Sequence, residues 1–85
     1  MNVSYERKFK KQYLKADKKI QAEFDKKVKQ FKKHPFHPQL KNHLLPGQYK
    51  NYRSINITGD WRAIYKEEKD ATVFLFLGTH SQLYK

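Results

Sequence analysis

The sequence has no cysteine, only three glycines and three prolines, and no long apolar run among its 85 residues. The absence of cysteine excludes a disulfide framework and a thiolate metal site. No segment approaches the roughly 20 consecutive apolar residues of a membrane-spanning helix, and no apolar run lies near the N-terminus. We therefore expect a soluble, cytoplasmic protein, and a chain of this length predicts one domain over residues 1–85.

Acidic residues are also scarce: eight face 19 lysines and arginines, which gives a formal net charge of +11. The imbalance is concentrated in residues 1–33, where twelve basic residues stand against four acidic ones. Such a field attracts polyanions, namely RNA, DNA, the ribosome or an acidic protein. A merely solvated, lysine-rich surface is the alternative, but the excess is large for so short a chain and favours polyanion binding.

The first half predicts a short strand at residues 2–5 and then two amphipathic helices. Asp17 is a candidate N-cap for the second helix, which Pro35 and Pro38 end because proline lacks a backbone donor. Apolar residues recur every three or four positions in both helices. They are Phe9, Tyr13 and Ala16 in the first helix and Ile20, Phe24, Val28 and Phe31 in the second.

The segment HPFHPQLKNHLLPGQ then predicts an ordered connector that ends in a turn at Pro46 and Gly47. Its Leu44–Leu45 pair is expected to be buried. Histidines at positions 34, 37 and 43 raise the question of a metal site. The prolines fix an extended backbone, and no carboxylate lies nearby in the sequence, so we expect neither a metal nor another cofactor.

The second half predicts three strands, at residues 49–57, 61–66 and 72–77. Alternation places Ile55 and Ile57 on one face of the first strand, and Trp61, Ala63 and Tyr65 on one face of the second. The run TVFLFL is apolar on both faces, as expected of a strand in the middle of a sheet. The predicted fold is α+β with the order β-α-α-β-β-β, in which two helices pack on one face of a mainly antiparallel sheet.

Polar side chains near the strand ends form the best candidate site. Histidine and carboxylate can exchange a proton, and arginine and lysine can hold a phosphate, which suits metal-free cleavage of RNA at its own 2′-hydroxyl. Each residue also has a structural alternative: a turn for Asp60, a strand cap for His80, packing for Tyr84 and a solvated position for Arg62. The candidate catalytic residues are His43, Asp60, Arg62, His80 and Tyr84.

The stretch NHLLPGQYKNYRSINITGDWRAIYK, followed by LFLGTHSQLYK, resembles the RelE/ParE toxin superfamily, and within it the YafQ-like branch. The resemblance covers residues 40–85, whereas the helical half fits only in length and charge. It implies a RelE-like, microbial-ribonuclease-like fold of the order given above. It also implies a ribosome-dependent endoribonuclease of a type II toxin–antitoxin system, which cuts messenger RNA in the ribosomal A site and is neutralised by a cognate antitoxin.

The same resemblance assigns roles to individual residues. His43, Asp60 and His80 match the catalytic positions of the branch, and His80 is the strongest candidate for the general acid. Tyr84 matches a terminal aromatic residue that could stack on a base. Arg62 stands where the wider RelE group often has a phosphate-holding arginine. Further candidates for contacts with RNA are Lys50, Arg53, Asn56, Trp61 and Lys85.

Two positions depart from the pattern of the branch. Asn56 replaces a second histidine and cannot carry a proton, and Phe76 replaces an arginine expected near the phosphate. Arg62 or Arg53 could substitute for that cation, although Arg53 shares its face with Ile55. These departures leave open a protein of the same fold that binds antitoxin or RNA with weak catalysis. A ParE-like inhibitor of DNA gyrase is a further alternative, against which the set of candidate catalytic residues argues.

Overall fold

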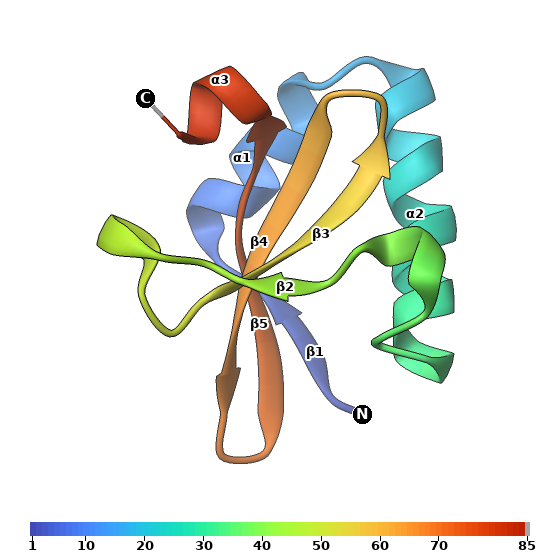
Figure 1. The fold of residues 1–85 in the computed structure, drawn as a ribbon. Coiled ribbons are helices and arrows are strands. Elements are labelled where there is room, and N and C mark those ends of the chain that lie inside the picture. Colours follow the sequence, from blue (N-terminus) through green and yellow to red (C-terminus); the bar gives the residue numbers. More distant parts are fainter. Residues whose placement is uncertain (85) are drawn as a thin grey trace.

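The computed structural model describes residues 1–84 and contains one mixed sheet with helices on both of its sides (Figure 1). Lys85, a predicted RNA contact, lies outside the described residues. The elements in chain order are β1 Val3–Tyr5, α1 Arg7–Lys15, α2 Lys18–Lys33, the 3-10 helix η1 Pro38–Leu40, β2 His43–Leu44, the 3-10 helix η2 Gly47–Tyr49, β3 Arg53–Thr58, β4 Trp61–Glu68, β5 Ala71–Thr79 and α3 His80–Leu83.

The sheet has five strands in the order β1-β5-β4-β3-β2. Only the β1–β5 pair is parallel, so the prediction of a mainly antiparallel sheet is confirmed. Strand β5 lies between β1 and β4, and the middle strand is β4. The expectation that the run TVFLFL forms the middle strand is therefore wrong in detail. It is apolar on both faces because it is an interior strand, but the two-residue β2 adds an unpredicted edge on the far side.

The two long helices begin and end where the sequence predicts. The Asp17 carboxylate accepts a hydrogen bond from the N–H of Ile20 at 3.0 Å, which caps the first turn of α2. The helix ends at Lys33, just before Pro35. The whole predicted stripe of α2 is buried: Ile20, Phe24, Val28 and Phe31. Within residues 1–84, no helix is long and apolar enough to cross a membrane.

Helices α1 and α2 cover one face of the sheet and enclose the main core (Figure 1). Aromatic rings dominate this core. The ring of Phe74 in β5 lies 5.6 Å from that of Phe24 and 5.5 Å from that of Phe31, both with edge-on geometry. Edge-to-face pairs of this kind stabilise the fold beyond the area that they bury. The other fully or nearly buried members are Phe9, Val28, Leu40, Ile55, Ile57, Ala63, Tyr65 and Leu77.

The opposite face, which we call the open face, carries a much smaller buried cluster of Leu45, Ile64 and Leu83. Residues 45–52 and α3 cover part of this face. The prediction that the Leu44–Leu45 pair is buried holds for one residue only, since Leu45 is 5% exposed and Leu44 is 58% exposed. Neighbouring residues of an extended segment point to opposite sides, so only one of the pair joins the cluster.

Helix α3 begins directly after β5, in a segment whose helical structure the sequence analysis did not predict. A capping box fixes its start: the Gln82 N–H donates to Thr79 Oγ1 at 3.3 Å, and the Thr79 N–H donates to Gln82 Oε1 at 2.9 Å. A Cβ atom at Gly78 would lie 3.0 Å from Gln82 Oε1 and 3.3 Å from the Leu83 side chain. A larger residue at this position would press on both side chains, so glycine suits the close approach of α3 to the strand.

Candidate active site

A cleft of about 510 Å³ opens on the open face of the sheet. Five of the ten residues predicted for the site line it, together with residues from the connector. The lining consists of Lys41, His43, Leu45, Pro46, Asn56, Arg62, His80 and Tyr84. Basic, amide and aromatic side chains thus converge on one hollow, as a site for an anionic ligand with flat rings requires.

Strand pairing assembles this cleft from distant parts of the sequence. Asn56 of β3 lies directly opposite Arg62 of β4, and His43 of β2 pairs with β3. Directly opposed residues of antiparallel strands point to the same face of a sheet. The short α3 then folds over this face and brings His80 and Tyr84 to the same hollow.

His43 is exposed at the edge of the sheet, and its ring orientation is fixed from one side. Its Nδ1 atom lies 2.8 Å from the carbonyl oxygen of Lys41. A carbonyl oxygen can only accept a hydrogen bond, so Nδ1 must carry the proton in this contact. In the neutral ring, Nε2 is then the acceptor, and His43 is poised to remove a proton from a ligand.

His80 is the first residue of α3, and its ring remains exposed to solvent. Its backbone N–H donates to the carbonyl oxygen of Asp60 at 2.9 Å, which ties the start of α3 to the β3–β4 turn. Its ring centroid lies 4.7 Å from that of Tyr84, one helical turn later. An exposed imidazole on an anchored backbone can exchange protons with a bound ligand.

Tyr84 contributes its ring rather than its hydroxyl group to the cleft. The ring packs edge-on against Tyr49 at a centroid distance of 5.8 Å, and the Tyr49 hydroxyl donates to the Leu83 carbonyl at 2.7 Å. The Oη atom of Tyr84 is buried and has no hydrogen-bond partner within residues 1–84. The accessible part of Tyr84 is thus a flat apolar surface, suited to stacking on a base.

Arg62 is held in place by the backbone of the β3–β4 turn. Its Nη1 donates to the carbonyl oxygens of Gly59 at 2.9 Å and Trp61 at 3.1 Å. A guanidinium has five N–H donors, so this anchoring leaves others free to bind phosphate oxygens. Arg62 is the cleft residue best fitted to stabilise added negative charge on a phosphate.

Asp60 lies at the rim of the cleft, not in its wall. It occupies the exposed tip of the β3–β4 turn, and its backbone carbonyl receives the hydrogen bond from His80. Asp60 is only two positions before Arg62 in the sequence, which suggests that the two side chains line the same pocket. The turn follows a register shift between Asn56 and Thr58, and Asp60 is not among the residues that line the cleft.

Three predicted RNA contacts lie outside the cleft. Strand alternation puts Arg53 on the same face as Ile55, and Trp61 on the same face as Ala63. Both residues therefore point to the helix-covered face. Arg53 Nε donates to Asn42 Oδ1 at 2.8 Å, and Trp61 packs against the main core. Of the two alternatives for the missing cation, Arg62 lines the cleft and Arg53 does not. Lys50 is exposed on the loop after η2, away from the cleft lining.

Asn42, which the sequence analysis missed, holds the connector that carries His43. Its Nδ2 donates to the Tyr65 hydroxyl at 2.7 Å and to the Pro35 carbonyl at 2.9 Å, while its Oδ1 accepts from Arg53. Burial raises the pKa of Tyr65, so its hydroxyl remains protonated at neutral pH. The network is partly buried and pairs the oxygen and the nitrogen of the Asn42 amide, which rigidifies the connector.

Lys41 is the second residue that the sequence analysis missed. It has a left-handed backbone with φ of 47°, which turns its carbonyl toward His43 while its side chain lines the cleft. The only sequence signal was a lysine two positions before a candidate catalytic histidine. Lys41 brings a second cation to the cleft besides Arg62.

Phe76, which stands where the resemblance leads us to expect an arginine, is half-buried on the open face. It packs against Tyr49 at 5.8 Å, and the ammonium group of Lys8 lies 5.2 Å from its ring centroid. The helix α1 thus provides a cation over the ring, in a cation–π contact.

The connector histidines have different roles from one another. His37 Nδ1 accepts a hydrogen bond from the backbone N–H of Gln39 at 3.1 Å, which caps η1. His34 ends α2. Among residues 1–84, no group of three or more histidine, aspartate or glutamate side chains is arranged to hold a metal ion.

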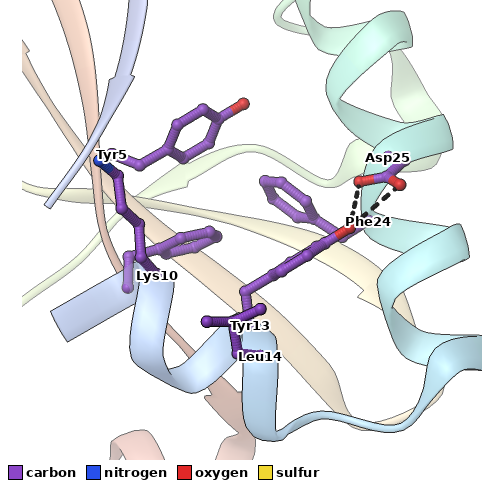
Figure 2. A pocket seen from close by; sticks show the side chains of 7 residues that line it. Tyr5, Lys10, Tyr13, Leu14, Phe24 and Asp25 are labelled. Carbon is purple, nitrogen blue, oxygen red and sulfur yellow. Dashed lines mark hydrogen bonds between the residues drawn. The ribbon is translucent and has the colours of Figure 1, made fainter. Parts of the chain in front are cut away.

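A separate hollow of about 360 Å³ lies between α1 and α2 and is mainly apolar (Figure 2). The Tyr13 hydroxyl donates to both oxygens of Asp25, at 2.9 and 3.1 Å. Burial and then this hydrogen bond raise the pKa of Tyr13, so it stays a donor and not a base. The hollow lacks histidine and arginine, so the open-face cleft is the better candidate for chemistry.

Comparisons with known proteins identify the family. The family model of the YafQ bacterial toxin of type II toxin–antitoxin systems matches residues 1–85. No curated protein matches the chain.

Among solved structures, YafQ from E. coli strain BL21(DE3) is 24% identical, with a TM-score of 0.84 over 99% of this chain and 98% of that chain. The E. coli DinJ–YafQ toxin–antitoxin complex matches at 26% identity and a TM-score of 0.79, over 99% and 97%. The HP0894 protein from Helicobacter pylori matches at 27% and 0.76, over 99% of both chains. These likenesses confirm the predicted RelE-like fold, and the chain belongs to the YafQ family of bacterial toxins from type II toxin–antitoxin systems, within the RelE/ParE superfamily.

Proposed function

We propose that this toxin is an endoribonuclease that cuts messenger RNA on the ribosome, without a metal ion, by attack of the RNA 2′-hydroxyl. The observation that carries the proposal is the convergence of His43, Arg62 and His80 on one cleft of the open face. Two imidazoles and a guanidinium are the groups that such a reaction needs. The net charge of +11 suits a protein that works against ribosomal RNA.

The proposed reaction uses the two histidines in opposite roles. Nε2 of His43 removes the proton from the 2′-hydroxyl, because Nδ1 is already occupied by the Lys41 carbonyl. The 2′-oxygen then attacks the adjacent phosphorus, and the bond from phosphorus to the 5′-oxygen breaks. His80 donates a proton to the departing 5′-oxygen. The products are a 2′,3′-cyclic phosphate and a 5′-hydroxyl.

The other cleft residues bind and orient the RNA in this scheme. Arg62 and Lys41 stabilise the negative charge that builds up on the crowded phosphate. Asn56 lies opposite Arg62 and donates or accepts hydrogen bonds without carrying a proton. The ring of Tyr84 forms a stacking surface for a base. Asp60, at the rim, supports the backbone at His80 and does not itself transfer a proton.

The partners follow from the family and from charge. YafQ of E. coli has been solved in complex with DinJ as a toxin–antitoxin pair. We accordingly expect this chain to have its own cognate antitoxin, which keeps it inactive in the cytoplasm. The lysine-rich helices α1 and α2 present a cationic surface to an acidic antitoxin segment in the resting state and to ribosomal RNA during cleavage.

The test is cleavage-site mapping on a defined message in a reconstituted translation reaction. The parent protein should cut at codons that ribosomes occupy, and should leave the same message intact when ribosomes are omitted. His80→Ala should abolish these cuts while it still binds ribosomes. Cuts of equal strength by the His80→Ala protein would refute the role of His80.

Two other results would replace the proposal. If the parent binds ribosomes but makes no cuts, the apolar Phe76 and the rim position of Asp60 leave only a binding protein of this fold. If expression induces DNA-damage signalling while messages remain intact, the chain is a gyrase inhibitor like the ParE members of the superfamily.

A further inference from the structure

A second polar hollow, of about 630 Å³, lies beside the cleft between α2 and the β3 side of the sheet. We call it the flanking hollow. It shares Lys41 and Asn56 with the cleft, so the two hollows adjoin at these residues. Its other polar side chains come from α2, η1 and β3, and are Lys26, Lys27, Gln30, Gln39 and Thr58.

The flanking hollow has the chemistry of an anion site. Among residues 1–84, the only charged side chains that line this hollow are lysines. Gln30 Nε2 donates to Gln39 Oε1 at 3.1 Å, which ties the floor of the hollow across α2 and η1. The Lys27 ammonium group also pairs with the Glu23 carboxylate at 3.5 Å, but Glu23 does not line the hollow. Ammonium and amide donors in a lining without carboxylates favour a phosphate over a cation or an apolar ligand.

The place of the hollow indicates where such a phosphate would come from. Arg62, in the wall of the cleft, donates to the carbonyl of Gly59, and Gly59 lines the flanking hollow. A strand of RNA whose scissile phosphate lies against Arg62 would reach this hollow by passing Asn56 and Lys41, which line both hollows. Proteins that hold single strands commonly combine a basic groove for the backbone with aromatic surfaces for the bases. Tyr84 supplies such a surface at the cleft end.

We propose that the flanking hollow is a subsite that binds the backbone phosphate next to the scissile one in single-stranded RNA, through Lys26, Lys27 and Lys41. This inference rests on the proposed function for the direction of the RNA through the cleft. Its contribution to the reaction is positional: a second grip on the backbone keeps the reacting 2′-hydroxyl from sliding relative to His43. The remaining lysines of α2, such as Lys18 and Lys19, lie outside the hollow.

The test measures binding without cleavage. The probes are a hexanucleotide and a dinucleotide RNA in which every 2′-hydroxyl is methylated, so that neither can be cut. Kd is measured by fluorescence anisotropy over a series of KCl concentrations for the parent and for Lys26→Gln/Lys27→Gln. The matched control is Lys18→Gln/Lys19→Gln, an exposed pair in the same helix with the same change in charge. Lys26→Arg/Lys27→Arg keeps the charge and should restore binding.

Loss of the two lysines in the hollow should weaken hexanucleotide binding by at least about threefold at 0.1 M salt and lower the slope of log K against log salt by about 0.7, which corresponds to one lost phosphate contact on a single strand. Dinucleotide binding should change less, since a dinucleotide fills only the cleft. Equal effects of the two double variants, or equal effects on both probes, would overturn the subsite.

The two proposals fail separately in these experiments. If the parent makes no cuts on ribosomes but the hollow variants selectively lose the hexanucleotide, the subsite stands and the ribonuclease proposal falls. If the parent cuts and His80→Ala does not, while Lys26→Gln/Lys27→Gln binds the hexanucleotide as the parent does, the ribonuclease proposal stands and the subsite falls.

Discussion

The two faces of the sheet differ in what they bury. The helix-covered face buries eleven residues in one core, and its aromatic rings contact one another in a continuous chain. Within residues 1–84, the buried hydrophobic cluster of the open face has three members, and a polar cleft lies beside them. Both faces are built from the same strands, whose alternate residues face opposite ways. A rigid, closed core on one side thus allows polar groups on the other side to be held in place without being buried.

The difference between the faces predicts which substitutions unfold the protein and which only inactivate it. Phe74→Ala, on the helix-covered face, should have the largest effect on stability. Phe74 is fully buried and contacts five other aromatic rings, so we expect a loss of about 3–5 kcal/mol in the free energy of unfolding. Phe76→Ala, on the open face, should cost less than half as much. Urea denaturation measures both, and equal losses would break the comparison.

His80→Gln should give the opposite result. Loss of general acid catalysis should lower the cleavage rate by about 10²–10⁴-fold. The side chain is exposed, so the free energy of unfolding should change by no more than about 0.5 kcal/mol. The rate is measured on ribosome-bound message and the stability in urea. A parallel loss of both quantities would mean that His80 is a structural residue.

Asn42→Ala tests the connection between the two faces. Tyr65 and Arg53 lie on the helix-covered face, and this substitution removes the amide that joins them to the connector that carries His43. We expect a loss of about 1–3 kcal/mol, because partly buried groups lose their partners. Cleavage should also fall under conditions where the variant is folded. Unchanged cleavage by the folded variant would show that the network does not position His43.

Tyr65, on the helix-covered face, should make the free energy of unfolding depend on pH. Burial raises the pKa of Tyr65 above its ordinary value of 10.0. The unfolded chain therefore releases this proton at a lower pH than the folded chain does. The stabilisation is fully present below about pH 10 and is lost as the pH rises above it. Tyr65→Phe should fall less steeply in stability between pH 9 and 11, and a slope equal to that of the parent would contradict the assignment.

Tyr84→Phe should have the smallest effect. The Tyr84 hydroxyl is buried without a partner among residues 1–84, so its removal should be neutral or stabilise the protein by up to about 1 kcal/mol. Because the ring that faces the cleft remains, cleavage should stay within about threefold of the parent. A large loss of cleavage would show that the hydroxyl group, and not the ring, acts on the RNA.

The parts of the fold that follow a regular period could be predicted from the sequence. The stripe of α2 and its cap at Asp17 are local features, and the alternation in β4 correctly separates Trp61 from Arg62. The same alternation placed Arg53 with Ile55, which explains why it lies outside the cleft. These predictions succeeded because each depends on residues close together in the chain.

The missed features depend on contacts between distant residues or on single unusual backbone angles. Strand β2 has only two residues, too few for a period to appear, and exists because it pairs with β3. Lys41 has a left-handed backbone, and nothing in the sequence signals this conformation at a residue other than glycine. The cap of α3 has a sequence signature, Thr79 followed three positions later by Gln82. The strong strand pattern just before it hides the start of so short a helix. Five of the cleft residues could therefore be predicted from the sequence, but neither Lys41 nor the shape of the cleft could be.

The most direct test of the central claim is the chemistry of the ends that this toxin leaves on a cut message. Attack by the RNA 2′-hydroxyl at the open-face cleft predicts a 2′,3′-cyclic phosphate on the upstream fragment and a 5′-hydroxyl on the downstream fragment. End-group analysis by mass spectrometry of the two fragments distinguishes these products from those of hydrolysis by water. A 3′-hydroxyl and a 5′-phosphate at the mapped cut would contradict the mechanism.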